Sequence, residues 1–258
     1  MQNNLEKRLA NGGSVCGPQE DGYTLSLPVL PAGTYGLAQL DDYMHLPRSK
    51  FPYQPPCKLE LEARISDPIL PGTWGFGFWN DPFSFGFGGG GMKRVLPVLP
   101  NAAWFFYGSP ENYLSLRDDQ PGAGFLAQTF RSPRLPSLLS VLALPGLPFL
   151  FWPAAARLIR RLAQSVVKED TRALSIAVES WHIYSLEWSD HRVVFSVDAK
   201  QILSTEVSPQ GNLGFVVWID NQYFRFDPTG KIGFGFLPVL DPGWLQSRHL
   251  SVTAQQAN

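Results

Sequence analysis

The side chains able to carry chemistry in this sequence form no known catalytic or metal-binding motif. The four histidines lie far apart, and neither a CxxC nor an HExxH pattern occurs. No spacing therefore argues for a metal site, and we expect neither a metal ion nor another cofactor. Three residues could serve as acid or base, namely His182, Tyr107 and Asp220, and no pattern selects among them.

Aromatic residues that alternate with glycine form the densest group of side chains suited to ligand binding. Within a strand, the stretches Trp74–Phe78, Phe83–Gly88 and Ile232–Phe236 place their large side chains on one face and their glycines on the other. A glycine face is entropically costly. We therefore expect either that a ligand or a chain segment lies against it, or that glycine relieves crowding on a curved sheet.

We predict that aromatic side chains from these and neighbouring strands line a cleft without carboxylates. Such a cleft suits an apolar or amphipathic small molecule, which the protein would bind with or without a conformational or acid/base transformation. The ligand-binding candidates are Trp74, Phe76, Phe78, Trp79, Trp104, Phe106, Tyr107 and Trp218.

The elements that position these residues are predicted to be short antiparallel strands. Residues 58–65 alternate strictly between apolar and polar, as in a strand with one buried side. Residues 181–188, 193–198 and 201–207 are expected to form a meander with polar turns. Further strands are expected at 23–29, 74–79, 83–87, 102–107, 113–117, 123–130, 213–219, 231–236 and 249–254.

The composition agrees with an all-β chain that has a substantial core. Of 258 residues, 44% are hydrophobic and only 17% are charged, with 24 glycines and 23 prolines. The formal net charge of −1 gives no general attraction for nucleic acid. We expect residues 1–20 to be a polar lead-in and residues 21–258 to be a single β-sandwich domain, interrupted by an insertion at 131–172.

The N-terminal residues and the cysteines indicate the cellular compartment that we expect for this protein. The first twenty residues contain no apolar stretch of the kind found in secretory signal peptides. We therefore expect a cytoplasmic protein, either free or at the inner membrane surface. In that compartment Cys16 and Cys57 are expected to be free thiols, although the sequence does not decide whether they pair.

The insertion combines an apolar stretch with a basic amphipathic helix. Residues 135–156 carry no charge, but four prolines argue against a straight transmembrane span. From Pro153 onward, apolar residues recur at helical spacing and the arginines fall mostly on another face. Seven bases and two acids give residues 131–172 a net charge of +5, against −6 for the remainder of the chain.

Two roles remain open for this insertion. A basic amphipathic helix entered through Phe149–Trp152 has the composition of a membrane-surface element, so residues 135–168 could make a peripheral contact with a bilayer. Alternatively, the insertion packs its apolar side onto the sandwich, as a lid or as core filler, and its arginines are solvated.

The predicted meander resembles part of a known family. Trp181-His-Ile-Tyr-Ser-Leu-Glu-Trp188, followed by Val193-Val-Phe-Ser-Val-Asp198, is similar to a stretch of the laminarinase-like glycoside hydrolases of family 16. Residues 61–65, 72–79 and 248–253 look like further strands of that family. The resemblance implies a concanavalin A-like antiparallel β-sandwich, or jelly roll, and touches most of the chain.

The sequence lacks the catalytic motif of that family. Its members carry E-x-D-x-(x)-E on one cleft strand, which provides a nucleophile and an acid/base. The matching strand here, Asn101–Tyr107, has aromatics and no acid. If this chain is an enzyme, we therefore do not expect a retaining glycosidase of the family-16 carboxylate type.

Two alternatives to apolar binding remain. A glycan-binding module would use tryptophan and tyrosine platforms together with the loops Trp79–Asp81 and Asp220–Tyr223. A divergent glycoside hydrolase would need a relocated pair of carboxylates that the sequence does not reveal.

Overall fold

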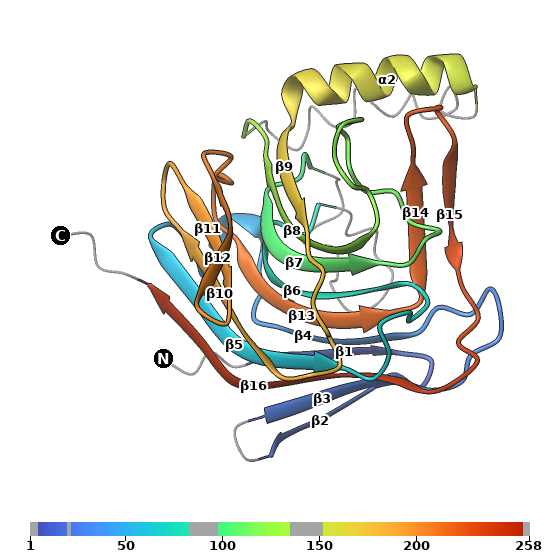
Figure 1. The fold of residues 1–258 in the computed structure, drawn as a ribbon, viewed down its shortest axis with the longest axis vertical. Helices are drawn as coiled ribbons and strands as arrows, with labels where there is room; N and C mark the ends of the chain where they lie inside the picture. Colours follow the sequence, from blue (N-terminus) through green and yellow to red (C-terminus); the bar gives the residue numbers. More distant parts are fainter. Residues whose placement is uncertain (1–4, 20–21, 83–97, 135–151, 255–258) are drawn as a thin grey trace.

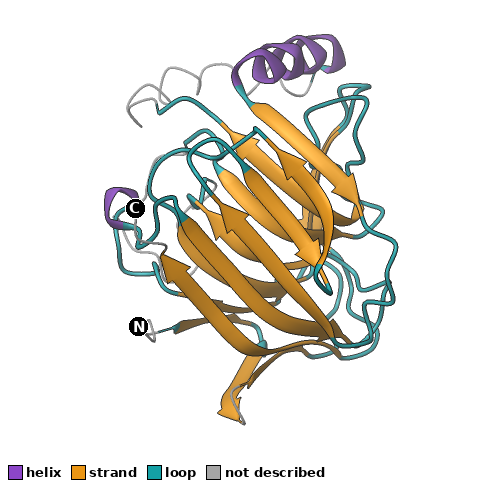
Figure 2. Cartoon of the chain, turned by 60° about the vertical axis from the view of Figure 1, so that its left-hand side comes forward, coloured by secondary structure: helices purple, strands orange, loops and turns teal. Residues whose placement is uncertain are grey.

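The computed structural model describes residues 5–19, 22–82, 98–134 and 152–254. Within these ranges the chain forms two seven-stranded antiparallel sheets packed face to face, a two-stranded hairpin and one α-helix (Figure 1). This confirms the expected all-β jelly-roll sandwich with a helical insertion. Figure 2 shows the α-helix at one end of the sandwich, beyond the strand ends.

The two sheets, called A and B, supply most of the secondary structure. In spatial order, sheet A contains β1 (Glu6–Ala10), β4 (Leu37–Asp41), β13 (Gly214–Asp220), β6 (Thr73–Trp79), β7 (Ala102–Gly108), β8 (Gly124–Arg131) and β9 (Lys168–Ala173). Sheet B contains β12 (Lys200–Thr205), β11 (Val193–Val197), β10 (His182–Trp188), β5 (Cys57–Ile65), β16 (Gly243–Ala254), β3 (Gly22–Leu27) and β2 (Ser14–Gln19). The remaining elements are the hairpin of β14 (Gln222–Phe226) and β15 (Ile232–Phe236), the helix α2 (Pro153–Val166) and a single 3₁₀ turn, η1 (Arg48–Lys50).

Strands with one buried side lie where the alternation predicts them. In β5, Leu59, Leu61 and Ala63 are buried, and the residues between them are partly exposed. β10, β11 and β12 form the expected meander, and β10 pairs with β5 so that His182 lies opposite Ala63. Alternating burial of this kind arises when one face of a sheet meets a core and the other meets water.

Several short strands and one loop differ from the prediction. Residues 113–117 form no strand, and Tyr113 makes only an isolated bridge to Arg225. Five short strands have no counterpart in the prediction, namely β1, β2, β4, β9 and β14. β1 and β2 lie within the predicted polar lead-in, and β9 is a mostly polar strand at the edge of sheet A. The strand predicted at 83–87 and residues 135–151 of the insertion lie outside the described residues.

Sheet A is buried on both faces, which removes the alternation that would show its strands. One face packs against sheet B around Phe76, Phe105 and Phe215. The opposite, outer face carries a second hydrophobic cluster that includes Trp104 and Trp218. As a result, β7 and β13 are buried at every position.

The aromatic–glycine alternation of β6 is explained by the close approach of the β7 backbone and of a tryptophan of β13. A Cβ at Gly75 would lie 2.4 Å from the carbonyl oxygen of Phe105 and 2.8 Å from Cη2 of Trp218. A Cβ at Gly77 would lie 2.5 Å from the carbonyl oxygen of Ala103 and 2.6 Å from Cα of Trp104. The backbone of β7 and the Trp218 ring of β13 therefore lie against the glycine face, and only glycine leaves room for them.

The helix α2 packs on the sandwich through its polar side. Arg160 is 2% exposed and Ala156 is fully buried, whereas Leu158 and Leu162 are both more than half exposed. The alternative in which this helix packs its apolar side onto the sandwich is therefore wrong. In the described part of the chain, no helix has the length and apolar character needed to cross a membrane.

Gly75→Ala is expected to lower the free energy of unfolding by about 1–3 kcal/mol, because the new methyl group overlaps the Phe105 carbonyl and the Trp218 ring. Gly233→Ala is the matched control, since it sits in the same aromatic–glycine pattern in β15 but its Cβ would meet no atom closer than 3.3 Å. Urea denaturation measures the free energy of unfolding of both variants. Equal losses in the two variants would contradict the close packing assigned to the outer face of β6.

Candidate functional site

Three tryptophans from three adjacent strands meet on the outer face of sheet A, and we call them the tryptophan cluster: Trp79 in β6, Trp104 in β7 and Trp218 in β13. The ring centroids lie 5.8 Å apart for Trp79 and Trp104, 6.4 Å for Trp79 and Trp218, and 5.6 Å for Trp104 and Trp218. Trp104 and Trp218 are each 8% exposed, whereas Trp79 is partly exposed. Trp79 thus offers the accessible ring, and the other two support it.

Each indole N–H of the cluster donates to a polar side chain. The hydrogen bonds run from Trp79 to the hydroxyl of Tyr43, from Trp104 to Oε1 of Gln128 at 3.1 Å, and from Trp218 to the hydroxyl of Thr73 at 2.9 Å. These partners set the orientation of the rings without any ligand, because a buried indole N–H is held where its acceptor lies.

A buried polar row borders the cluster on the side of β4. In the register of sheet A, Gln39 lies between Arg8 of β1 and Trp218 of β13. Its Nε2 donates to Oδ2 of Asp41 at 2.7 Å and lies 3.5 Å from the hydroxyl of Tyr43. Burial raises the pKa of Tyr43 well above its ordinary value, so this hydroxyl stays neutral. A row of polar side chains therefore extends from the edge strand β1 to Tyr43.

Arg8 brings unsatisfied donors to this row. Its Nε and Nη2 atoms are buried, and neither has a hydrogen-bond partner within the described part of the chain. Its charge is close enough to act on the phenols of Tyr35 and Tyr43, whose pKa values it lowers against the larger, opposite effect of burial. Buried N–H groups without an acceptor cost free energy, so an oxygen-bearing ligand at this position would stabilise the site.

On the other side of the cluster, Gln128 connects Trp104 to a buried carboxylate. Gln128 donates from Nε2 to Oε1 of Glu169 at 3.1 Å, and the hydroxyl of Thr171 donates to the same oxygen at 3.0 Å. Oε2 of Glu169 accepts from the backbone N–H of Leu116 at 2.7 Å. Both oxygens of Glu169 are thus engaged, and the carboxylate holds Gln128 and Trp104 in place.

Asp220 lies on the same face and titrates near neutrality. Its Oδ1 accepts from the Thr73 backbone N–H at 3.2 Å, the Thr73 hydroxyl at 2.7 Å and the Gln222 N–H at 3.2 Å. Burial nevertheless raises the pKa of Asp220 from 3.8 to about 7, because the loss of hydration outweighs these bonds. Since the Thr73 hydroxyl also accepts the N–H of Trp218, the carboxylate is directly connected to the tryptophan cluster.

The eight predicted ligand-binding aromatics do not line one cleft. Four of them lie in the core between the sheets, namely Trp74, Phe76, Phe78 and Tyr107. The prediction is wrong for these residues because successive side chains of β6 and β7 alternate between the two faces. The other four, Trp79, Trp104, Phe106 and Trp218, do come together on the outer face, where Phe106 lies 6.0 Å from Trp218.

The three candidate acid/base residues are not brought together. His182 lies in sheet B, where Nδ1 is 2.6 Å from Oδ2 of Asp198 and Nε2 is 3.1 Å from the carbonyl oxygen of Ala177. Tyr107 belongs to the core between the sheets, and burial raises its pKa to about 12. Asp220 lies on the outer face of sheet A. No two of these residues can therefore act on the same bond of a substrate.

The outer face of β7 carries no carboxylate. Ala102, Trp104 and Phe106 project there, at the positions where the related family would carry its acids. Asp41 and Asp220 share this face, but the pairing of β4 with β13 sets them at opposite ends of the paired segment. In the ranges that the structure describes, no three His, Cys, Asp or Glu side chains lie close enough to hold a metal ion.

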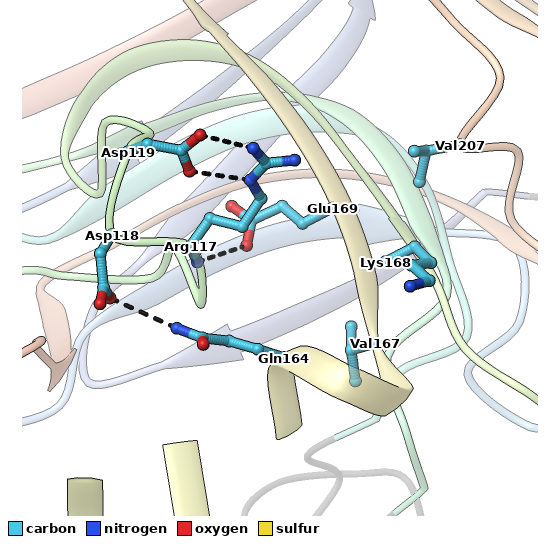
Figure 3. Close-up of a pocket in the computed structure, with 8 residues that line it drawn as sticks. All are labelled: Arg117, Asp118, Asp119, Gln164, Val167, Lys168, Glu169 and Val207. Carbon is cyan, nitrogen blue, oxygen red and sulfur yellow. Dashed lines mark hydrogen bonds and ion pairs between the residues drawn. The ribbon is translucent and has the colours of Figure 1, made fainter. Parts of the chain in front are cut away.

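A separate surface pocket of about 490 Å³ opens between α2, β9 and the loop that follows Leu116 (Figure 3). It is lined by Arg117, Asp118, Asp119, Gln164, Val167, Lys168, Glu169 and Val207. Most of its polar groups are paired with one another, including Arg117 with Asp119 at 2.9 Å and Gln164 with Asp118 at 3.3 Å (Figure 3). It contains no predicted ligand-binding residue, so we do not place the candidate site there.

Sequence reasoning missed the polar half of the site. Arg8 and the pair of Gln39 and Asp41 lie in β1 and β4, two short strands that the sequence does not reveal. Gln128 is a polar residue within the predicted strand 123–130, flanked by apolar neighbours. That position was a usable signal, because a buried amide in an apolar strand must find a partner. Arg8 offers no comparable signal.

No protein-family model and no curated protein matches this chain. Among solved structures, a family-16 glycoside hydrolase from the mixed linkage glucan locus of Bacteroides ovatus, in complex with a product, has a TM-score of 0.49 at 11% identity, over 98% of this chain and 96% of that one. The carbohydrate binding module CBM66 from Bacillus subtilis has a TM-score of 0.41 at 7% identity, over 98% and 96%.

A botulinum neurotoxin type C chain, described as depending on two ganglioside molecules for cell entry, has a TM-score of 0.45 at 7% identity. The match covers 100% of this chain but 44% of the neurotoxin chain, so the present chain spans less than half of its length. At such identities and TM-scores, no ligand or activity is transferred from these proteins to this chain.

Asp220→Asn is expected to change how stability depends on pH. Because the folded pKa of about 7 lies above the ordinary value of 3.8, Asp220 destabilises the fold progressively as the pH rises from about 4 to about 7, and constantly above that. The asparagine variant keeps the Oδ1 acceptor and removes this penalty, which is on the order of 4 kcal/mol at most. Urea denaturation of both proteins at pH 4 and pH 8 should show equal stability at the lower pH and a more stable variant at the higher pH. A constant difference would contradict the assigned pKa.

Proposed function

We propose that this chain binds a saccharide on the outer face of sheet A, between Arg8 at the β1 edge and the accessible ring of Trp79. A sugar has an apolar face that packs on an aromatic ring and hydroxyl groups that exchange hydrogen bonds with polar side chains. The outer face offers both, since the tryptophan cluster carries the accessible ring of Trp79 and Arg8 has guanidinium donors without a partner in the described part of the chain.

The observation that carries the proposal is the pair of guanidinium N–H groups of Arg8 that have no acceptor among the described residues. An apolar or amphipathic small molecule would suit the aromatic side chains, but its apolar part provides no acceptor for these donors. A saccharide oxygen does provide one. This favours a neutral glycan over the apolar ligand as the occupant of the face.

The proposed activity is binding without hydrolysis. Glycoside hydrolysis of the family-16 kind uses two carboxyl groups about 5–5.5 Å apart. The outer face of β7 has none, and both oxygens of Glu169 are occupied by hydrogen bonds within the protein. A divergent hydrolase is distinguished by an assay for new reducing ends in the same glycan solutions, where we expect none.

Trp79→Ala is expected to weaken binding of soluble β-glucans and neutral oligosaccharides by about tenfold or more, because it removes the accessible ring of the platform. Trp181→Ala is the matched control. Trp181 is also partly exposed, but it lies beneath the guanidinium of Arg248, 4.2 Å from ring centroid to Cζ, away from sheet A. Titration calorimetry of a glycan panel measures both affinities. Flat titrations of the unmodified protein across the panel would remove the proposal.

Arg8→Met separates the two ligand classes, since it keeps an apolar stem and deletes the guanidinium. Saccharide affinity should fall by about tenfold, as expected for a lost charged hydrogen bond. Stability should not fall, because the deleted Nε and Nη2 groups have no partner in the described part of the protein. If the variant instead binds an apolar fluorescent probe more tightly and no glycan binds the parent, the apolar ligand is the better assignment.

A further inference from the structure

The helix α2 is held to the protein by hydrogen bonds from its inward side. Arg160 donates from Nε and Nη2 to Oδ1 of Asp118, at 3.1 and 3.0 Å, and from Nη1 to the carbonyl oxygens of Ser115 and Phe226. Gln164, one turn later, donates to a further backbone carbonyl at 2.6 Å. These bonds determine which side of the helix faces the sandwich, and a buried arginine cannot turn outward without leaving those carbonyls unsatisfied.

The opposite side of α2 is apolar and exposed. Leu158, Leu162 and Val166 repeat every four residues and are 57%, 59% and 41% exposed. Trp152, directly before the helix, is 65% exposed. The four-residue spacing aligns the three aliphatic side chains in one stripe along the helix. We call these four residues the outward stripe.

The charges that flank the outward stripe are positive. α2 contains three arginines and no acidic residue. Asp118 pairs with Arg160 on the inward side, at 3.0 Å. Arg157 and Arg161 are exposed. Nη1 of Arg157 donates a hydrogen bond to the carbonyl oxygen of Thr229 at 3.1 Å. An apolar stripe with exposed cations along one edge is complementary to a surface that is apolar below and anionic above.

We propose that α2 docks on an anionic lipid bilayer, with its axis in the membrane plane and the outward stripe among the acyl chains. Arg157 and Arg161 would contact lipid phosphate groups, because a basic amphipathic helix gains both apolar burial and electrostatic attraction at such a surface. Trp152 would lie at the level of the headgroups, where tryptophan is enriched.

A bilayer fits this surface better than a protein groove does. Figures 1 and 2 both show α2 as the outermost described element at one end of the sandwich, so a flat surface can reach its whole length. The stripe is exposed, and no described element packs against it to form a groove. The tryptophan cluster belongs to the sheet face and is independent of this contact, so membrane docking adds to the proposed saccharide binding and does not rest on it.

The test is cosedimentation of the full chain with vesicles of phosphatidylcholine and phosphatidylserine, and with vesicles of phosphatidylcholine alone. We expect binding to the anionic vesicles that weakens as salt is added. The double variant Leu158→Ser/Leu162→Ser should lower the partition coefficient at least about tenfold, because it removes most of the apolar area of the stripe. Arg157→Gln/Arg161→Gln should abolish the preference for anionic vesicles.

The matched control is Ile69→Ser/Leu240→Ser, which replaces two aliphatic residues that are 74% and 77% exposed elsewhere on the molecule. It should bind as the unmodified chain does. All the substituted side chains are exposed, so circular dichroism should show every variant folded. The proposal is overturned if the unmodified chain does not sediment with anionic vesicles, or if the serine variant sediments equally. It is also overturned if the outward stripe instead supports a lipid-independent dimer, detected by sedimentation equilibrium, that excludes vesicle binding.

Discussion

The close packing of the β7 backbone and of Trp218 against the glycines of β6 is the constraint on which the rest of the structure depends. A side chain at Gly75 would overlap the Trp218 ring and the Phe105 carbonyl oxygen, and one at Gly77 would overlap the backbone of Ala103 and Trp104. The glycines cost conformational entropy, and the burial of two tryptophans offsets that cost. The consequence is a sheet with a hydrophobic cluster on each face, so its outer face is a structured surface and not merely the solvent side of a sandwich.

This packing also explains why the outer face can recognise a ligand with a fixed geometry. The indole N–H groups donate to Tyr43, Gln128 and Thr73, and each of those residues has further polar neighbours on the same face. The rings are therefore oriented before any ligand arrives, which lowers the entropy that binding has to overcome. Arg8 differs from the rest of the face, because its donors are the ones left without acceptors in the described residues.

How far the sequence predicts this structure depends on how many faces of a strand are buried. β5 and the meander β10 to β12 have one buried side, so their alternation predicts both their position and their orientation. β6 and β7 are predicted as strands, but both of their faces are buried, so the pattern does not show which face meets the core. The sequence therefore predicts a single cleft for Trp74, Phe76 and Trp79, which lie on opposite faces. β1 and β4 are too short to show a pattern, and the polar half of the site lies in them.

The orientation of α2 shows the same ambiguity in a helix. Its amphipathic pattern predicts two different faces, but periodicity alone does not decide which face meets the protein. Arg160 decides it, because the carbonyl oxygens of Ser115 and Phe226 and the carboxylate of Asp118 satisfy its guanidinium in a buried place. A packed leucine would leave those carbonyls without donors.

The loop that anchors α2 is also tied to the tryptophan cluster. The N–H of Leu116 donates to Glu169, which holds Gln128 and through it Trp104, while the carbonyl oxygen of Leu116 accepts from Gln164 of α2. One short loop therefore fixes the helix on one side and the tryptophan support on the other. A displacement of α2 that moved this loop would strain the bond to Glu169, so the helix must stay docked on its polar side for the outer face of sheet A to keep its geometry.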